Sequence, residues 1–526
     1  MPCHRIWRRF NGDRAQGTDS AGRLCCSTLG VPLAGAPRAR PGIRAGVIIE
    51  HEITRPTENA KRILPWLVAV AFFLESLDTT ILNTAVPVVS GALHIAPLSM
   101  KAVLASYTLS LAVFIPISGW VADKFGTRRV FTAAIGLFTL SSCLCGLTSD
   151  VHMLVAFRVL QGCGGAMMIP VGRLTLVRTF AKSELVRAMS FVAIPGLIGP
   201  MLGPIAGGLI VAYFHWRLIF FVNLPIGLIG LWMVYRHLPD YREATVNALD
   251  IEGLVLFGSG IGLLSYVLEV FGEHTLSIRE ITALLVLSIA LIGSYGLHAR
   301  REAYPLLDLS LFRLRTFRTA ATGSFFTRIG IGGVPFLLPL LYQVGLGFTP
   351  VQSGLLIMPQ AFAAMSTKIF IRRILTRLGY RGLLVTNTLI LGVLLLAFST
   401  IGPNTAVWAI VLLAFSYGAF ASMQYTSMNT LVYADITDSQ TSNASSLAST
   451  LQQMSMSFGV ATAGLATAWF VPDRFSATPG ELVHGIHEAL GVLGGFTILS
   501  TLIFARLHRN DGAVVSQHNA THAQED

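Results

Sequence analysis

Two carboxylates lie in a stretch of sequence that is otherwise almost wholly apolar. The stretch FFLESLDTTILNTAVPVV runs from Phe72 to Val89 and carries Glu75 and Asp78 three residues apart. An ionised side chain inside the hydrocarbon layer of a membrane is costly, so such residues face a protein interior and often serve ion or proton pathways. We therefore predict that Asp78 binds a coupling proton.

An arginine in a second apolar stretch, HMLVAFRVLQGCGG, is the expected partner of Asp78. The helical rise of about 1.5 Å per residue places both Asp78 and Arg158 in the outer half of the membrane. Two opposite charges at similar depth should face a shared interior and interact. A nearby cation favours the ionised form of a carboxylate, so a change in the Asp78–Arg158 distance would load or release the proton.

Two further charges are candidates for the same machinery. Glu75 lies one helical turn before Asp78 on the same face, so it is either a second proton site or the group that recognises a cationic substrate. Arg328, in the stretch FFTRIGIGG, is another candidate for proton coupling. The alternative for all four charges is that they only hold helices together.

The apolar composition indicates an integral membrane protein. The chain has 526 residues, of which 53% are hydrophobic and 12% charged, whereas a soluble protein has about 25% charged residues. Apolar runs of about 18 residues or more are typical of membrane-spanning helices. We predict an all-α integral membrane protein with about fourteen transmembrane helices, near residues 65–89, 102–122, 130–148, 152–177, 188–213, 217–237, 251–271, 281–298, 319–343, 350–371, 383–401, 406–431, 446–471 and 484–505.

A short repeated motif predicts two related halves. DKFGTRR follows the second predicted span and TRLGYRG follows the tenth. Two six-helix halves around a site near the middle of the membrane are a known plan of transporters. The predicted organisation is a disordered basic tail (1–62, with translation expected to begin near Val47), a six-helix half (63–245), two inserted helices (246–300), a second six-helix half (301–508) and a disordered tail (509–526).

The distribution of basic residues predicts the orientation. Lysine and arginine concentrate in the even-numbered loops, for example Arg128, Arg178 and Arg372. Short loops rich in these residues stay in the cytoplasm. We expect a multi-pass protein of the bacterial inner (plasma) membrane, in contact with membrane lipid and with both termini in the cytoplasm.

The fifth predicted span is unusual in its glycines and prolines. It reads IPGLIGPMLGPIAGGLI, with Gly199, Gly203 and Gly207 at every fourth position. A stripe of small residues lets two helices approach closely, while Pro200 and Pro204 each remove a backbone donor. We predict that this helix forms a sliding or rocking contact during gating.

The predicted cytoplasmic turn GWVADKFGTRRV is a second candidate for gating. Its glycines permit a tight turn, and its aspartate can cap a helix or pair with an arginine. Such contacts would latch the two halves together, the alternative being simple anchoring by positive charge. The candidate residues are Gly119, Asp123, Gly126, Arg128 and Arg129.

Polar side chains in several other spans are candidates for a substrate cavity. Hydrogen bonding between helices is the simpler role for amides inside a membrane, and lining a wet cavity is the second. The candidates are Asn83, Gln161, Gln343, Gln424, Asn429 and Gln453.

No motif of an enzyme, a cofactor site or a metal site stands out in the sequence. It contains no P-loop, no His-Glu-x-x-His and no Gly-x-Ser-x-Gly pattern. The six cysteines have no spacing typical of metal ligands or of a disulfide framework. We expect neither an enzyme nor a cofactor, a metal or a nucleic-acid partner.

Taken together, the motifs resemble those of the major facilitator superfamily and, more narrowly, the fourteen-span drug:proton antiporters of the EmrB/QacA type. The resemblance runs from about residue 64 to residue 505. It is carried by LDTTILNTAVP (Asp78, Asn83, Pro87), GWVADKFGTRR, RVLQGCGGA (Arg158, Gln161, Gly162, Gly164), GPMLGPIAGG, WRLIFFVNLPIG (Trp216, Arg217, Asn223, Pro225) and PLLDLSLFRLRTF. Glu75 is outside this pattern, and the second-half loop FIRRILTRLGYR lacks the acid of its counterpart.

The resemblance implies a major facilitator fold that works by alternating access, with proton uptake driving export. We therefore expect a proton-coupled efflux antiporter for amphipathic, often cationic, drugs or toxic small molecules. A periplasmic adaptor protein is a further candidate partner. The alternative is a proton-coupled symporter or a facilitator of a metabolite.

Overall fold

Long helices make up the part of the chain that the structure describes. This computed structural model describes residues 58–180, 182–243, 245–270, 276–437, 440–471, 478–508 and 510–512. Nearly all of the predicted tails, 1–62 and 509–526, lie outside the described residues. Within these ranges every regular element is helical, so the predicted all-α class is confirmed.

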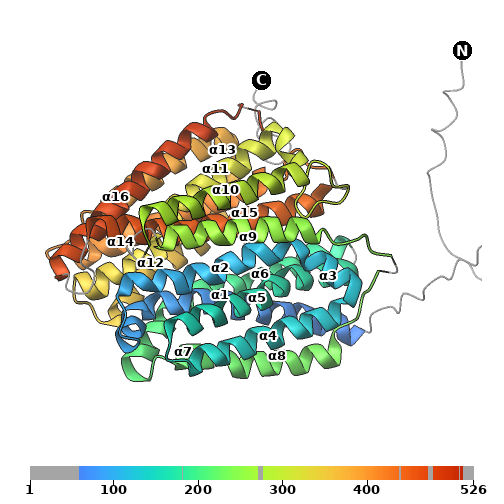
Figure 1. Ribbon diagram of the computed structural model, residues 1–526, viewed down its shortest axis with the longest axis horizontal. Helices are drawn as coiled ribbons and strands as arrows, with labels where there is room; N and C mark the ends of the chain where they lie inside the picture. The colour runs from blue at the N-terminus through green and yellow to red at the C-terminus, as the bar shows by residue number, and fades with distance from the viewer. Residues whose placement is uncertain are drawn as a thin grey trace, which may run out of the picture. The chain divides into compact units, whose positions relative to one another are not determined.

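Sixteen α-helices follow one another along the described residues (Figure 1). The first half holds α1 (Glu58–Ala92), α2 (Lys101–Phe114), α3 (Ser118–Phe125), α4 (Thr127–Leu147), α5 (Val151–Thr179), α6 (Lys182–Tyr213), α7 (Leu218–Phe221) and α8 (Asn223–His237). The inserted pair is α9 (Ile251–Val270) and α10 (Ile278–His298). The second half holds α11 (Arg315–Gly332), α12 (Val334–Leu340), α13 (Pro350–Phe398), α14 (Val407–Leu431), α15 (Thr441–Phe470) and α16 (Pro479–Phe504).

The helices account for the predicted membrane spans. Among the described residues, 12 helical segments are long and apolar enough to cross a membrane. One of them, α13, has 49 residues and contains two predicted spans. The many Ser, Thr and Gln residues of α15 make it less apolar than these segments, although it has 30 residues. Counting both arms of α13 and adding α15 recovers the predicted fourteen.

Two glycines of the repeated motif turn the chain in equivalent places. Gly126 separates α3 from α4 with φ 95°, and Gly379 separates the two arms of α13 with φ 65°. Each is the glycine shared by DKFGTRR and TRLGYRG. Residues other than glycine rarely adopt a positive φ because their Cβ clashes with the backbone. The repeat therefore marks one sharp helix reversal in each half.

The inserted helices lie at the junction of the two halves. In Figure 1, α9 and α10 run side by side, with α2 next to α9. Helix α9 contacts both α2 of the first half and α15 of the second half. The Lys101 ammonium at the start of α2 donates to the backbone carbonyl of Glu269 in α9 at 2.6 Å.

Large apolar side chains cover the outer surfaces of the helices. Trp232, Trp408 and Trp469 are each more than 60% exposed. Exposed apolar side chains of this size would be unfavourable in water but suit contact with lipid. This pattern agrees with a multi-pass membrane protein.

Replacing Gly379 by alanine should destabilise the protein. The φ of 65° would force the new Cβ into the left-handed region, at a cost of about 1–2 kcal/mol. Gly382, three residues on, lies in ordinary helix, and a Cβ there would only touch Leu378 at 3.7 Å. The thermal unfolding temperature of the detergent-purified protein should fall for Gly379→Ala and stay the same or rise for Gly382→Ala. Equal unfolding temperatures for the two variants would contradict the prediction.

Candidate functional site

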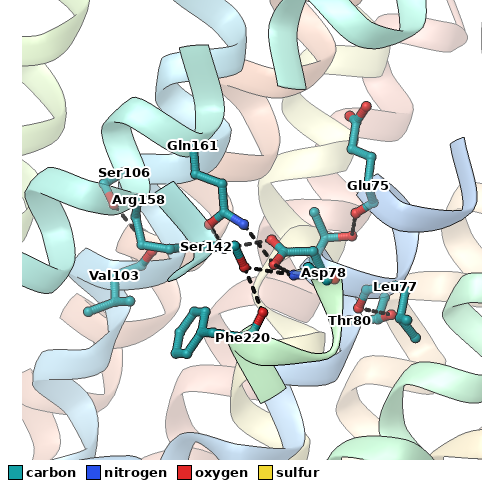
Figure 2. A network of polar contacts seen from close by, with 12 residues as sticks. Glu75, Leu77, Asp78, Thr80, Val103, Ser106, Ser142, Arg158, Gln161 and Phe220 are labelled. Atoms are coloured by element: carbon teal, nitrogen blue, oxygen red, sulfur yellow. Dashed lines mark hydrogen bonds and ion pairs between the residues drawn. The ribbon is translucent and has the colours of Figure 1, made fainter. Parts of the chain in front are cut away.

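Asp78 is the centre of a buried polar network that joins helices of the first half (Figure 2). Its Oδ2 accepts a hydrogen bond from Arg158 Nη1 at 2.6 Å. Its Oδ1 accepts from Gln161 Nε2 at 2.9 Å and from Asn223 Nδ2 at 2.8 Å. All four residues are at most 1% exposed. The structure thus brings together Asp78 of α1, Arg158 and Gln161 of α5, and Asn223 of α8.

The hydrogen-bond pattern assigns Asp78 the ionised form in this conformation. Arg158 offers donors only. Gln161 Oε1 accepts from Arg158 Nη1 at 2.7 Å, so its amide nitrogen is the group that faces Asp78. Asn223 Nδ2 also lies 3.0 Å from Ser142 Oγ, and that hydroxyl donates to a backbone carbonyl at 2.9 Å. Every hydrogen-bond neighbour of the carboxylate among the described residues is therefore a donor, and none of them is an acceptor placed to receive a proton from it.

The packing of α5 against α2 holds Arg158 in place. The Arg158 guanidinium lies over the ring of Tyr107, with its Cζ 4.4 Å from the ring centroid, a cation–π geometry. Arg158 and Gln161 are three residues apart and so share one face of α5. A Cβ on the next residue, Gly162, would lie only 2.7 Å from the carbonyl oxygen of Tyr107. Glycine at this position lets the two helices come close enough for the arginine and the ring to stack.

A cavity of about 1310 Å³ is lined by helices of both halves. Its walls include α1, α5 and α6 of the first half and α15 of the second. Its mouth is formed by Asp123, by residues from the 243–250 and 304–308 segments, and by the start of α15. All of these segments are predicted to be cytoplasmic.

The two halves are in contact away from this mouth. The carbonyl of Pro204 in α6 faces Gly354 at the start of α13, where a Cβ would lie 2.9 Å from the Pro204 carbonyl carbon. Gln343 Nε2 donates to the backbone carbonyl of Thr84 in α1 at 2.8 Å. The cavity is therefore open on the side predicted to be cytoplasmic, while α1 and α6 meet the second half at the other end.

Glu75 lines this cavity, whereas Asp78 lies behind its wall. Glu75 is 8% exposed, and its buried Oε2 has no hydrogen-bond partner among the described residues. Figure 2 shows its carboxylate directed away from the Asp78 network, although the two residues are one turn apart. The two carboxylates of the sequence motif thus have separate environments.

The glycine stripe of α6 packs against α1 in the same half. A Cβ on Gly199 would collide with the Ser76 side chain, and one on Gly203 would collide with Thr80. Gly207 faces the backbone of α1 in the same way. These contacts flank Asp78 on α1, so a displacement of α6 would act directly on the helix that carries the carboxylate.

The opposite side of α6 faces the second half of the protein. The helix continues through Pro200 and Pro204. Near its end, a Cβ on Gly208 would lie 2.9 Å from the carbonyl carbon of Pro350 in α13. Helix α6 therefore links the Asp78-bearing helix to the interface between the halves.

The charged turn after α3 makes its contacts within the first half. Arg178 Nη2 lies 2.8 Å from both Asp123 Oδ1 and Glu243 Oε1. The Arg128 backbone N–H donates to Asp240 Oδ1 at 3.0 Å. All of these residues precede α9, and the cavity mouth separates them from the second half. In this conformation the described ion pairs of the turn lie within the first half, and the latch between the halves stays a prediction.

The remaining predicted residues fall into separate places. Asn429 and Gln453 line the cavity, as does Gly119 of the turn, whereas Arg129 is exposed. Gln161, Gln343 and Gln424 instead make hydrogen bonds between helices, and Gln424 Nε2 donates to Thr388 Oγ1 at 2.7 Å. Asn83 is half-buried in α1 and is not among the lining residues.

Arg328 occupies a separate buried site in the second half. Its Nη2 donates to Asn429 Oδ1 at 2.8 Å and its Nε donates to Ser324 Oγ at 2.9 Å. Its guanidinium lies over the ring of Tyr425, 4.4 Å from the centroid. No carboxylate of the described residues forms an ion pair with it. The site resembles the stacking of Arg158 on Tyr107, without the aspartate.

Sequence reasoning missed three residues of the site. Arg173 of α5 lines the cavity, and Ser142 and Tyr107 support the Asp78 network. Arg173 carried a usable signal, because it is a charge inside a predicted span, as Arg158 is. A serine or a tyrosine in an apolar helix is too common to attract attention without its neighbours.

Comparisons with known proteins agree with this architecture. The model of the Major Facilitator Superfamily matches residues 68–460. A relative from Escherichia coli O17:K52:H18, named "Putative multidrug resistance protein MdtD", is 41% identical over 84% of this chain and 94% of its own length. A protein of the same name from Pectobacterium carotovorum is 40% identical over 79% of this chain and 89% of its own length.

Solved structures show the same fold at low sequence identity. A D-xylose-proton symporter aligns with a TM-score of 0.61 at 14% identity and covers 85% of this chain and 98% of its own. A bacterial homolog of the human lysosomal transporter Spinster aligns with a TM-score of 0.60 at 14% identity over 88% of this chain and 98% of its own.

Removing Arg158 alone should destabilise the protein more than removing both members of the ion pair. The Arg158→Met change leaves Asp78 as a buried charge without its counter-ion, at a cost of about 3–5 kcal/mol, whereas Asp78→Asn with Arg158→Met leaves no net charge. The measurement is thermal unfolding of the purified protein, where the double variant should unfold at a higher temperature than Arg158→Met.

A partly exposed ion pair provides the control for this comparison. Lys61 Nζ and Glu184 Oε2 are 3.9 Å apart with side chains 33% and 55% exposed, so neutralising either should change the unfolding temperature little. Asp78 and Arg158 are not coupled if the decreases in unfolding temperature of Asp78→Asn and of Arg158→Met simply add up in the double variant.

Proposed function

Because this chain belongs to the Major Facilitator Superfamily, we propose that it is a proton-coupled antiporter that exports amphipathic small molecules. The two halves would expose the central cavity to one side of the membrane at a time. The multidrug resistance names of relatives at about 40% identity support drugs or toxic compounds as substrates. The chain would lie in the bacterial inner membrane with both termini in the cytoplasm.

The observation that carries the proposal is the buried ion pair of Asp78 with Arg158. In the conformation described, three donors hold the carboxylate in its ionised form. Separating Asp78 from Arg158 without protonating Asp78 would leave an unpaired carboxylate in a medium of low dielectric constant. A proton taken up by Asp78 removes that charge, so separation of the pair and protonation favour each other.

The contacts of α6 supply a route from this proton to the movement of the halves. The glycines of α6 touch α1 on both sides of Asp78, and the end of α6 touches α13 of the second half. A shift of α1 on protonation would therefore be passed to the interface between the halves. The close packing at Gly199 and Gly203 would transmit the shift of α1 to α6.

The exchange direction distinguishes the antiporter from the alternative symporter or facilitator. With the cavity open to the cytoplasm, a substrate would bind near Glu75 while Asp78 is ionised. Proton uptake from the outside would follow release of the substrate there. A periplasmic adaptor is a further proposed partner.

Replacing Asp78 by asparagine should abolish proton-driven transport. The neutral amide cannot cycle between charged and protonated forms, so substrate uptake into inverted vesicles should lose its response to an imposed pH gradient, with at least a roughly 10-fold fall in rate. Glu252→Gln, at an exposed carboxylate of α9, is the control and should behave as the wild type. Wild-type, gradient-driven activity of Asp78→Asn would remove this residue from the mechanism.

The mouth of the cavity should be reachable from the cytoplasm. Asn443 lines the mouth and is exposed, while Val407 is exposed at the start of α14, in the part predicted to face outside. In a background without the six native cysteines, a membrane-impermeant maleimide should label Asn443→Cys in inverted vesicles and Val407→Cys in intact spheroplasts. The reverse labelling pattern would invert the proposed orientation.

A further inference from the structure

We propose, on the basis of the export function above, that the cavity selects zwitterionic small molecules. Glu75 would hold the ammonium group of the substrate, and Arg173 would hold its carboxylate. Both residues line the same cavity, and they come from α1 and α5.

The charged residues of the cavity fall into two groups. Four acidic residues at or near the mouth already have partners. Asp123 and Glu243 are paired with Arg178, and Asp250 and Asp308 accept backbone N–H groups, each at 3.0 Å. These carboxylates are occupied by neighbouring protein groups and serve the structure of the mouth.

Glu75 and Arg173 are the remaining charged residues of the described lining, and they differ from the first group. The Glu75 Oε2 atom is buried without a hydrogen-bond partner among the described residues. Arg173 forms no ion pair within that part of the chain, and its guanidinium Cζ lies 5.2 Å from the centroid of the Phe72 ring. Phe72 precedes Glu75 by one turn of α1, so both charges are presented near the same stretch of wall.

Two opposite charges that form no salt bridge within the described ranges line one cavity, the buried Glu75 and the exposed Arg173, and together they favour a ligand that carries both charges. A buried charge is stabilised only when a counter-charge or several hydrogen bonds offset its lost hydration. A singly charged ligand would satisfy one residue and leave the other unmatched. A zwitterion satisfies both and adds no net charge to the cavity, which suits a site that must open to either side of a membrane.

A series of three ligands on one scaffold tests the proposal. The probes are the dipeptide diphenylalanine, which is zwitterionic, its C-terminal amide, which is cationic, and its N-acetyl derivative, which is anionic. Binding to the purified full-length protein is measured by calorimetry at pH 7 without any gradient. The dipeptide should bind at least about 10-fold more tightly than either derivative, as expected for one extra charge-assisted contact.

Variants of the two residues should change this preference in opposite ways. Glu75→Gln should weaken the dipeptide and the amide about 10-fold and leave the N-acetyl form unchanged. Arg173→Gln should weaken the dipeptide and the N-acetyl form and leave the amide unchanged. Glu75→Asp and Arg173→Lys, which keep the charges, should retain the order of the wild type, and Glu252→Gln is the control.

The preference of the wild-type protein decides the question even if a variant fails to fold. Equal affinities for the dipeptide and the amide, no binding of any probe, or unchanged ratios in the two charge-removing variants would overturn the inference. Zwitterion binding without proton-driven transport would contradict only the proposed antiport. Proton-driven export of the amide with no preference for the dipeptide would contradict only the inference about charge.

Discussion

The ion pair between the Asp78 carboxylate and the Arg158 guanidinium constrains how the helices of the first half pack. Separating these two buried charges would be costly, so helices α1 and α5 keep them together unless a proton neutralises the carboxylate. Gln161 and Asn223 extend the arrangement to α8, and Ser142 extends it to α4. A change in protonation at Asp78 therefore affects contacts of four helices, of which α1 and α5 line the cavity.

The same half separates Asp78, the proposed proton site, from Glu75, the proposed substrate contact. Asp78 is enclosed by donors behind the cavity wall, while Glu75, one turn earlier on the same helix, lines the cavity with an oxygen atom that has no hydrogen-bond partner in the described part of the chain. Because both are carried by α1, and α1 is packed on the glycines of α6, the two sites can influence each other without sharing a ligand. This arrangement suits exchange, in which the proton and the substrate occupy the protein in turn.

The sequence alone identified charged residues that are buried, but it did not show which way each uncharged polar side chain faces. Asp78, Arg158 and Arg328 stand out because an ionisable residue in an apolar run has few explanations, and the structure buries all three. The amides are different, because an amide serves equally well between helices or in a cavity. Gln453 lines the cavity while Gln424 bonds to Thr388, and only the rotation of each helix decides between these outcomes. Likewise, the stripe of Gly199 and Gly203 predicted close packing but not that α1 is the partner.

The position of the inserted helices makes the two lateral seams of the protein unequal. Helix α9 covers the seam where α2 meets α15, whereas exposed apolar residues such as Leu202 and Leu355 flank the seam between α6 and α13. A compound dissolved in the bilayer therefore meets α9 on one flank of the junction and the directly packed helices α6 and α13 on the other. A lipophilic compound that entered from the bilayer would have to pass between α6 and α13, because α9 covers the opposite seam.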